Sequence, residues 1–425
     1  MDNKLKIGIF GGGVVGGGVY QIISRKMNNG KFNKIGINLE ISKICVRSLD
    51  KLRDYKLGDE CTFVTNYDDI LLDDSINCVV EVMGGVTDAK DVVFKAIEKG
   101  KHVITANKAL VAKHLVEIKD LLKENPNVQF CYEAAVCGGI PIIHSLQSDF
   151  IGDDITKVMG IMNGTTNFML TKMEKEGVSY DKVLKEAQDL GYAEADPTAD
   201  VEGHDVQAKI ALLANLAYGQ VIPIRHIPTI GISSISSVDF EYAKILGSTI
   251  KLVGCASLNQ NKTISVYVSP MIVSLDSALS SATGAGNMVL VESNNNIEST
   301  FAGPGAGRYP TANSVVNDII RLNLGQVTKP FPLEDNIKIN NNYNASFYVR
   351  INVKDSVGII KSVGEKAEES DISIHAILQN PITSHDNLNF VVTTEKCFLL
   401  QIENFVASLE KCDFTLSKPL YMPIC

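Results

Sequence analysis

The sequence predicts an α/β protein that opens with a doubly wound parallel sheet and continues into α+β domains. In the first 150 residues, short apolar runs alternate with helical stripes, and a glycine-rich turn directly follows the first run, Leu5–Phe10. Beyond about Phe150 this alternation changes. Residues 345–425 then follow the order β-α-β-β-α-β, which is that of a ferredoxin-like unit.

Composition excludes several function classes. Of the 425 residues, 45% are hydrophobic and 21% are charged, and the formal net charge of −9 argues against nucleic-acid binding. No apolar run is long enough to span a bilayer, and the N-terminus enters a strand rather than a signal peptide. None of the nine cysteines forms a C-x-x-C pair, so thiolate metal sites are not indicated. We therefore expect a cytoplasmic protein without a membrane or nucleic-acid partner.

The glycine-rich turn has the spacing of a dinucleotide-binding loop. Gly11, Gly13 and Gly16 fit G-x-G-x-x-G between the first strand and a helix whose apolar stripe begins at Val19. In such a turn the glycines let the backbone approach a pyrophosphate, and the helix N-terminus favours its negative charge. The sequence thus predicts a Rossmann-type nucleotide site, with a purely structural glycine turn as the alternative.

The end of the second strand, predicted over Glu40–Val46, indicates which dinucleotide is bound. NAD sites usually place an acidic residue there, but this chain has Arg47, with Arg53 nearby. A guanidinium at this point suits the 2′-phosphate of NADP. We therefore expect NADP(H) to be preferred over NAD(H), the alternative being a solvated basic loop.

Further residues fall at the same edge of the sheet. Gly84 follows one buried strand, and Lys108 lies just past another, where it can meet cofactor or substrate. Spacing alone equally permits a surface lysine at this position. The predicted elements here are strands Asn77–Met83, His102–Thr105 and Val128–Tyr132 and a helix at Ala89–Lys99.

The region after Phe150 is predicted to form a substrate and dimerisation domain, with the active site in the crevice between domains. A second glycine cluster at Gly303–Gly307 precedes a helix that starts near Thr311 and should pack back on the first domain. Together with the glycine-rich turn after the first strand, this cluster favours one ligand that both segments bind. The alternative is that Gly303–Gly307 is an ordinary loop. The predicted elements are strands Ile155–Met162, Lys251–Ala256, Ile264–Val268 and Met288–Val291, a polar turn at Asn163–Phe168, and helices at Met169–Glu176 and from Gly203 to Tyr218.

The most informative stretch is GYAEADPTADVEGHDVQAK, residues 191–209. Its first part has the pattern of a loop, and from Gly203 the pattern turns helical, which places Asp205 and Lys209 four residues apart and within reach of each other. A buried pair of this kind beside an acidic loop can bind a substrate ammonium and can exchange a proton with a substrate hydroxyl through Lys209. The alternative is an acidic helix N-terminus followed by an ordinary surface ion pair.

The last part of the chain is predicted to be a separate regulatory unit. Prolines and an asparagine run mark Leu324–Asn344 as a linker. After the linker we expect strands Ala345–Val353, Ile372–Gln379, Asn389–Thr394 and Leu420–Ile424 and helices Ile359–Glu369 and Leu399–Leu409.

Taken together, these motifs resemble homoserine dehydrogenase, a family that interconverts aspartate semialdehyde and homoserine. The resemblance covers nearly the whole chain, and its most specific motif is the stretch 191–209. The other motifs, in the family's order, are GGGVVG, EVMGG, TANKALVA, EAAVCGGIPII, NGTTNF, HIPTIGI and GPGAGRYPTANSVVNDI. The tail resembles an ACT domain. Because no kinase domain precedes residue 1, the chain looks like the monofunctional form.

The resemblance implies roles for individual residues. Lys209 would be the catalytic lysine and Asp205 its acidic companion, and Lys108 would lie by the nicotinamide and the reacting centre. The substrate, chiefly its ammonium group, would be held by Glu194 and Asp200, with Tyr192 beside them. The cofactor would be bound by Gly11, Gly13, Val14, Val15, Gly16, Arg47 and Gly84 and closed over by Gly303 or Gly305.

The resemblance also implies partners. A monovalent cation, usually sodium, would be held largely by the backbone carbonyls of Glu133, Val136, Gly138 and Ile140. Threonine would inhibit through the tail, where Asp355 and Gly358 match the ligand-loop pattern. The family further implies a homodimer or homotetramer and a place in the aspartate-derived pathway to threonine, methionine and isoleucine.

The predicted domains are a Rossmann domain at 1–150, completed by a helix around 305–325, and a substrate and dimerisation domain at 151–325. A linker at 326–344 and an ACT domain at 345–425 follow.

Because a free lysine has a pKa of about 10.4, oxidation of the substrate through Lys209 should favour alkaline pH. Two alternatives stay open at this point. One is another NAD(P)-dependent hydroxy- or amino-acid dehydrogenase with the same layout, and the other is a non-catalytic amino-acid sensor.

Overall fold

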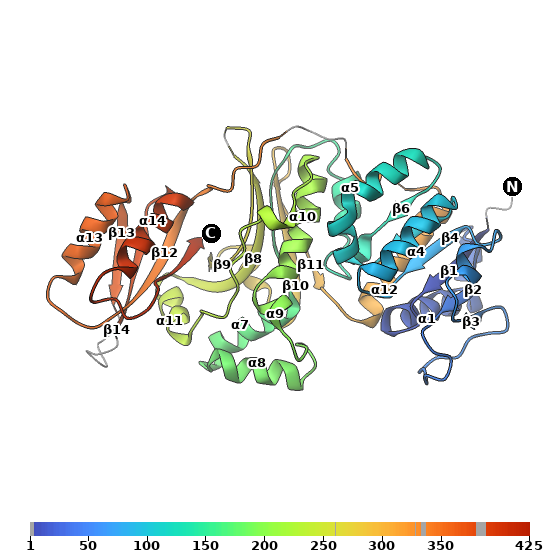
Figure 1. Cartoon of the computed structure of the whole chain (residues 1–425), viewed down its shortest axis with the longest axis horizontal. Coiled ribbons are helices and arrows are strands. Elements are labelled where there is room, and N and C mark those ends of the chain that lie inside the picture. The colour runs from blue at the N-terminus through green and yellow to red at the C-terminus, as the bar shows by residue number, and fades with distance from the viewer. Residues whose placement is uncertain (1–3, 260, 328, 333–336, 380–387) are drawn as a thin grey trace. The chain divides into compact units, whose positions relative to one another are not determined.

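The protein is described from a computed structural model that covers residues 4–259, 261–327, 329–332, 337–379 and 388–425 (Figure 1). Its contacts divide the chain into two compact units, each with a mixture of helices and strands. Unit 1 comprises Met1–Ile155, Ala211–Ile224 and Glu292–Asn336, and unit 2 comprises Thr156–Ile210, Arg225–Val291 and Ile337–Cys425. The division into three domains and a linker remains a prediction.

Unit 1 is built on a parallel sheet with the strand order β3-β2-β1-β4-β5-β6, which is the order of dinucleotide-binding doubly wound folds. The predicted parallel sheet is therefore confirmed. Its strands are β1 (Leu5–Phe10), β2 (Leu39–Cys45), β3 (Thr62–Val64), β4 (Cys78–Glu81), β5 (His102–Thr105) and β6 (Phe130–Cys131). The other elements of this unit are α1 (Val14–Asn28), α2 (Lys31–Lys34), α3 (Asp68–Leu71), α4 (Thr87–Glu98), α5 (Lys108–Glu124), η1 (Glu133–Ala135), α6 (Ile142–Ser148), β11 (Ile297–Pro304) and α12 (Arg308–Asn323).

The late helix α12 completes this unit by packing on α1, as the sequence predicts. Its buried residues Ala312, Val315 and Ile319 join the core that also contains strands β1 and β2. A Cβ atom at Gly18 would lie 2.9 Å from the Ala312 Cβ, so the glycines at the start of α1 permit this close approach of two helices. Gly17 and Gly18, which both face residues of α12, therefore serve helix packing.

Unit 2 contains a mixed sheet whose strands run in the order β10-β7-β8-β9-β16-β12-β14-β13. The long antiparallel pair of β8 and β9 lies at its middle, and Ile424 of β16 pairs with Ile272 of β9, which joins the tail to this sheet. The strands are β7 (Ile155–Ile161), β8 (Ser248–Leu258), β9 (Ile264–Ser274), β10 (Gly286–Ser293), β12 (Asn344–Val353), β13 (Ile374–Gln379), β14 (Leu388–Thr394), β15 (Cys397–Phe398) and β16 (Leu420–Ile424). The helices are α7 (Gly164–Glu176), α8 (Tyr180–Asp189), α9 (Thr198–Val201), α10 (His204–Tyr218, which extends into unit 1), η2 (Ile224–His226), α11 (Ser237–Ile245), η3 (Ala278–Ser281), α13 (Ile359–Glu369) and α14 (Leu399–Glu410).

The tail has the element order that the sequence predicts, β12-α13-β13-β14-α14-β16, with the short β15 as an addition. Its strands pair antiparallel. One buried cluster contains side chains of this tail, such as Phe347 and Phe405, together with Met159 and Val253 of β7 and β8. The tail and the β7–β9 region therefore share a hydrophobic core. The assignment of the tail as an ACT domain stays a prediction.

Two local predictions are wrong. The NGTTNF segment is not a polar turn, because α7 already begins at Gly164 and the Asn163 side chain accepts a hydrogen bond from the Thr166 N–H as its N-cap. The loop before Gly203 also contains the short helix α9. Both segments contain small polar residues, which occur in turns and at helix starts alike. A side chain caps α7, whereas α9 begins after Pro197 without a side-chain cap.

The structure bears on the absence of apolar spans and on the surroundings of the cysteines. No helix within the described ranges has the length and apolar character needed to cross a bilayer. Most of the nine cysteines are buried, where the side chain acts as a small apolar group.

Candidate functional site

A cavity of about 700 Å³ opens beside the glycine turn of unit 1. Its wall combines the glycine turn, the end of β2 and the end of β4, which meet at one edge of a parallel sheet. The predicted cofactor residues on this wall are Gly11, Gly13, Arg47 and Gly84. Val14 and Val15 begin α1 beside it, whereas Lys108, Gly303 and Gly305 are not among its lining residues.

The glycine turn is shaped by steric contacts that only glycine permits. Gly11 has a φ of 111°, and a Cβ atom at Gly16 would lie 1.8 Å from the Gly11 carbonyl oxygen. Gly13 differs, because nothing lies within 4 Å of a Cβ atom built there. Gly16 is therefore required by the fold of the turn itself, while Gly13 leaves space in front of the helix N-terminus, where a phosphate is favoured.

The basic loop after β2 places three cationic side chains, Arg47, Lys51 and Arg53, around this cavity. The Arg53 guanidinium is engaged with its own loop: it donates to the carbonyls of Lys51 and Ser48, each at 2.8 Å, and lies 4.6 Å from the centre of the Phe63 ring. Arg47 is exposed at the cavity. Arg53 thus shapes the loop, and Arg47 and Lys51 provide charge toward a ligand.

A buried carboxylate that the sequence analysis does not single out organises the neighbouring edge of the sheet. Glu81, the last residue of β4, accepts hydrogen bonds from the Met83 N–H at 2.8 Å and from the Thr105 hydroxyl at 2.6 Å. Asn107 donates to the Gly85 carbonyl at 2.6 Å and caps α5, which begins at Lys108. Burial raises the pKa of Glu81. This network fixes the segment around Gly84 and the position of Lys108.

The four predicted cation ligands lie in one short loop of unit 1 between β6 and α6. Cys137 and Gly138 have φ values of 54° and 45°, so two successive residues adopt the left-handed conformation, which is costly for a cysteine. The Gly138 carbonyl accepts a hydrogen bond from the Ser314 hydroxyl at 2.7 Å, and the Ile140 carbonyl accepts one from the Ile142 N–H at 2.9 Å. Each carbonyl oxygen has a second lone pair, so these groups fit a weakly bound cation with oxygen ligands.

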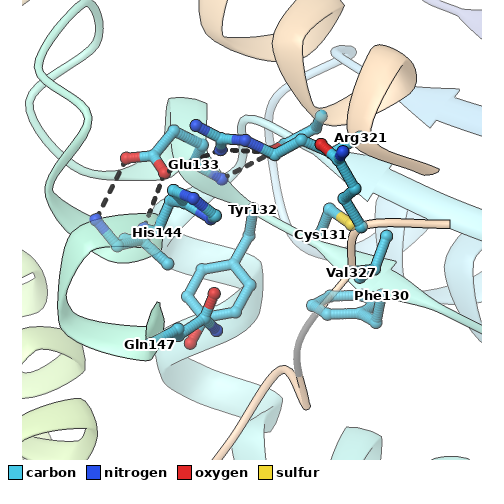
Figure 2. Close-up of a pocket in the computed structure, with 11 residues that line it drawn as sticks. Phe130, Cys131, Tyr132, Glu133, His144, Gln147, Arg321 and Val327 are labelled. Carbon is cyan, nitrogen blue, oxygen red and sulfur yellow. Dashed lines mark hydrogen bonds and ion pairs between the residues drawn. The ribbon is translucent and has the colours of Figure 1, made fainter. Parts of the chain in front are cut away.

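The Glu133 side chain has a structural task beside this loop. Figure 2 shows its carboxylate at the start of α6, where it accepts hydrogen bonds from the N–H groups of Ile143 and His144 at 3.0 and 2.7 Å. Arg321 approaches the same carboxylate at 3.6 Å, and Asp318 accepts a hydrogen bond from the Glu133 N–H at 3.0 Å. Burial raises the pKa of Glu133 and raises that of Asp318 to about 8. The adjoining cavity of about 20 Å³ has room for a water molecule but not for a substrate.

In unit 2, Asp205 and Lys209 form the predicted pair on α10. The Lys209 Nζ lies 2.7 Å from the Asp205 Oδ2, and the two side chains are only 9% and 10% exposed. Lys209 also donates to the Met162 carbonyl at 2.5 Å. The alternative of an ordinary surface ion pair is therefore wrong, because surface pairs are solvated on both partners.

Asp200 joins this pair through a residue that the sequence analysis assigns only to a turn. The side-chain amide of Asn163 donates to the Asp200 Oδ1 at 2.7 Å and to the Asp205 Oδ2 at 2.9 Å. We call Asn163, Asp200, Asp205 and Lys209 the acid–lysine cluster. Its members come from α9, α10 and the junction before α7, so only the fold brings them together. The NGTTNF motif was the available sequence signal for Asn163.

The other predicted substrate residues lie near the surface. Tyr192 is 46% exposed, and its ring stacks on Phe168 with centroids 4.8 Å apart. Glu194 is exposed in the loop before α9, and its backbone carbonyl accepts a hydrogen bond from the Gln188 side chain at 3.1 Å. In the tail, Asp355 and Gly358 are exposed, and Gly358 has a φ of 97° as the N-cap of α13.

Among the described residues, no group of three or more His, Cys, Asp or Glu side chains could hold a metal ion. This does not test the predicted cation site, because its ligands are backbone carbonyls.

Comparisons with known proteins show which family this chain resembles. Residues 11–133 match the family model described as homoserine dehydrogenase, NAD binding domain, and residues 141–320 match the model described as homoserine dehydrogenase. A homoserine dehydrogenase from Bacillus subtilis is 40% identical over 91% of this chain and 90% of its own length. The crystal structure of a homoserine dehydrogenase from Thiobacillus denitrificans matches with a TM-score of 0.92 at 32% identity, covering 99% of this chain and 98% of that one. A hyperthermophilic archaeal homoserine dehydrogenase in complex with NADPH matches with a TM-score of 0.64 at 28% identity, over 76% of this chain and 99% of that one.

Proposed function

Because this chain belongs to the homoserine dehydrogenase family and is an oxidoreductase with an NAD-binding domain, we propose that it interconverts L-homoserine and L-aspartate 4-semialdehyde with Lys209 as the proton-transferring group. The observation that carries the assignment of Lys209 is its burial beside Asp205 and the Met162 carbonyl. An amine held in this way can exchange a proton with a substrate oxygen. The reaction belongs to the aspartate-derived route to threonine, methionine and isoleucine.

Different residues of the chain carry out proton transfer, orientation of the amine and substrate binding. A bound nicotinamide supplies or accepts the hydride. In reduction, Lys209 gives a proton to the oxygen of the new hydroxyl, and in oxidation the neutral amine takes that proton back. Asp205 orients the amine and stabilises its charged form. Glu194 and Asp200, with Tyr192 beside them, bind the substrate ammonium, and Lys108 acts at the nicotinamide end.

The cofactor is NADP(H) in preference to NAD(H). The exposed Arg47, supported by Lys51 in the same cavity, offers a 2′-phosphate two positive charges, and no acidic residue occupies the position after β2 that usually holds NAD. Val14, Val15 and Gly16 present the start of α1 to the pyrophosphate, and Gly303 or Gly305 closes over the cofactor. The NADPH in the archaeal structure is in line with this preference.

Sodium is held by the carbonyls of Glu133, Val136, Gly138 and Ile140, where it fixes the loop before α6.

The tail is an ACT-type domain that binds threonine near Asp355 and Gly358. Support for this comes from the β-α-β-β-α-β order and from the glycine that opens α13. The enzyme is a homodimer or homotetramer in the cytoplasm.

A single assay tests most of these statements. Absorbance of the reduced nicotinamide is followed with L-homoserine and either NADP⁺ or NAD⁺, with and without sodium and threonine. We expect turnover, a higher kcat/KM with NADP⁺, stimulation by sodium and inhibition by threonine. Absence of turnover with both cofactors in folded protein would contradict the proposed reaction. A threonine-insensitive enzyme would contradict the regulatory assignment alone.

A further inference from the structure

Asn163 connects the acid–lysine cluster to the fold of unit 2. It lies between β7 and α7 and is only 5% exposed. Its Oδ1 accepts hydrogen bonds from the Thr166 N–H at 2.8 Å and from the Thr166 hydroxyl at 3.0 Å. These two contacts fix the orientation of the amide, because the oxygen must face α7.

The amide nitrogen consequently faces the carboxylates. Asn163 donates to the Asp200 Oδ1 at 2.7 Å and to the Asp205 Oδ2 at 2.9 Å, which accounts for both of its side-chain N–H groups. The same Asp205 oxygen also accepts a hydrogen bond from the Lys209 amine at 2.7 Å. The residue before Asn163, Met162, supplies the second acceptor for Lys209.

The capping role alone does not explain why this residue is an asparagine. An N-cap needs only an acceptor oxygen, and serine, threonine or aspartate supplies it about as well. Only the amide nitrogen of asparagine, with its two N–H groups, can donate to two carboxylates at once from this position. Without it, the two carboxylates would face each other with the Lys209 ammonium on the Asp205 side, and one of the carboxylates would tend to move away or take up a proton.

We propose that Asn163 is a positioning residue that holds Asp200 and Asp205 side by side and thereby fixes the amine of Lys209 for proton transfer. This inference rests on the proposed function, because it takes Lys209 as the proton-transferring group. It adds a residue whose contribution acts through the two carboxylates and not through contact with substrate.

The test compares three variants. Asn163→Ser keeps a capping oxygen and loses the two-pronged donor. Asn163→Asp keeps the cap and donates one hydrogen bond only while it is protonated. The matched control is Asn167→Asp, because Asn167 is a buried asparagine in the first turns of α7, the helix that Asn163 caps, and its amide donates to the carbonyls of Ala282 and Gly286. The control carboxylate would face the Lys251 amine, which lies 3.5 Å from the Asn167 Oδ1.

For activity, kcat of aldehyde reduction is measured between pH 6 and pH 9 together with the melting temperature. We expect Asn163→Ser to lower kcat about tenfold or more, as for a lost hydrogen bond to charged groups. For Asn163→Asp, the ratio of its kcat to that of the wild type should fall at least about tenfold with rising pH, because the ionised side chain can no longer donate. The titratable groups that contact this side chain or its partners are Asp200 from α9 and Asp205 and Lys209 from α10. Asn167→Asp should keep a constant ratio.

A second readout does not depend on turnover. Competitive acetylation of Lys209 with acetic anhydride, read by peptide mass spectrometry, reports how firmly the amine is held. Labelling should rise about fivefold in Asn163→Ser and stay at the wild-type level in Asn167→Asp. Equal labelling in all folded variants would overturn the positioning role, as would pH profiles that run parallel to that of Asn167→Asp. Failure of the proposed function looks different, because Lys209→Ala would then keep its turnover while Asn163→Ser still changed the labelling of Lys209.

Discussion

The candidate sites of the two units differ in whether backbone or side chains form them. In unit 1 the glycine turn is made of backbone, and its geometry depends on side chains being absent from Gly11 and Gly16. In unit 2 the acid–lysine cluster is made of side chains that are buried and hydrogen-bonded to one another. Binding a pyrophosphate requires several backbone N–H donors and no acid or base. Proton transfer requires one titratable side chain held in the correct position.

This difference has consequences for mutation. A backbone site is damaged by adding atoms, and a side-chain site by removing them. The first kind of change should act mainly on cofactor binding and the second mainly on the chemical step. The following variants test this contrast, from the largest expected effect to the smallest.

Lys209→Ala should lower kcat by roughly 10²–10⁴-fold, because proton transfer by a positioned side chain contributes about that much. The KM for the cofactor should change little. The matched control is Lys361→Ala on α13, since Lys361 and Glu365 have the same i, i+4 spacing at 3.6 Å but are 81% and 55% exposed. Steady-state kinetics of both variants decide the matter, and a Lys209→Ala enzyme with near wild-type kcat would remove Lys209 from the mechanism.

Gly13→Ala and Gly16→Ala separate a glycine needed by the ligand from one needed by the fold. A Cβ at Gly16 meets a backbone oxygen at 1.8 Å, so Gly16→Ala should lower both the melting temperature and the cofactor affinity. Gly13→Ala meets nothing within 4 Å, so its melting temperature should stay unchanged. Its cofactor Kd should still rise roughly tenfold or more if a phosphate occupies that space. Thermal melts and nicotinamide fluorescence titrations measure the two effects, and an unchanged Kd for Gly13→Ala would place the pyrophosphate elsewhere.

Arg47→Ala tests the proposed role of this arginine in cofactor choice. Loss of a charged hydrogen bond to the 2′-phosphate should raise the KM for NADP⁺ by about ten- to a hundredfold. The KM for NAD⁺ should stay nearly constant, because NAD⁺ has no 2′-phosphate. Arg25→Ala, at an exposed arginine in the last turn of α1, serves as the charge control. Equal effects of Arg47→Ala on both cofactors would contradict the NADP assignment.

Lys251→Met contrasts Lys209 with a buried lysine of unit 2 that lies outside the acid–lysine cluster. Burial lowers the pKa of Lys251, so its charged form is less favoured in the folded protein than in the unfolded chain. Lys251 therefore reduces stability at pH values below its folded pKa, and this loss disappears as the pH rises toward the ordinary value of about 10.5. Lys251→Met should raise the melting temperature at pH 7 with little change at pH 10, and kcat should be unaffected. A gain that is independent of pH would show that packing, and not charge burial, is responsible.

Much of this molecule was predictable because it depends on local patterns. Strands β1, β5 and β16 and helix α13 have the predicted bounds, since each is a short apolar run or an amphipathic stripe between clear breakers. The glycine spacing identified the nucleotide turn, and the i, i+4 spacing identified Asp205 and Lys209 as partners. Family membership follows from motif order along the chain.

The tertiary structure decided the burial of that pair, which spacing cannot reveal because exposed and buried i, i+4 pairs look alike in sequence. It also decided which partners the pair has. Asn163 lies 37 residues from Asp200 and 42 from Asp205 in the chain, and they meet because β7, α7, α9 and α10 pack together. Glu81 and Asn107 became organisers of the sheet edge for the same reason. Sequence fixes which groups are present and their local geometry, whereas contacts between distant segments depend on a packing that no local pattern encodes.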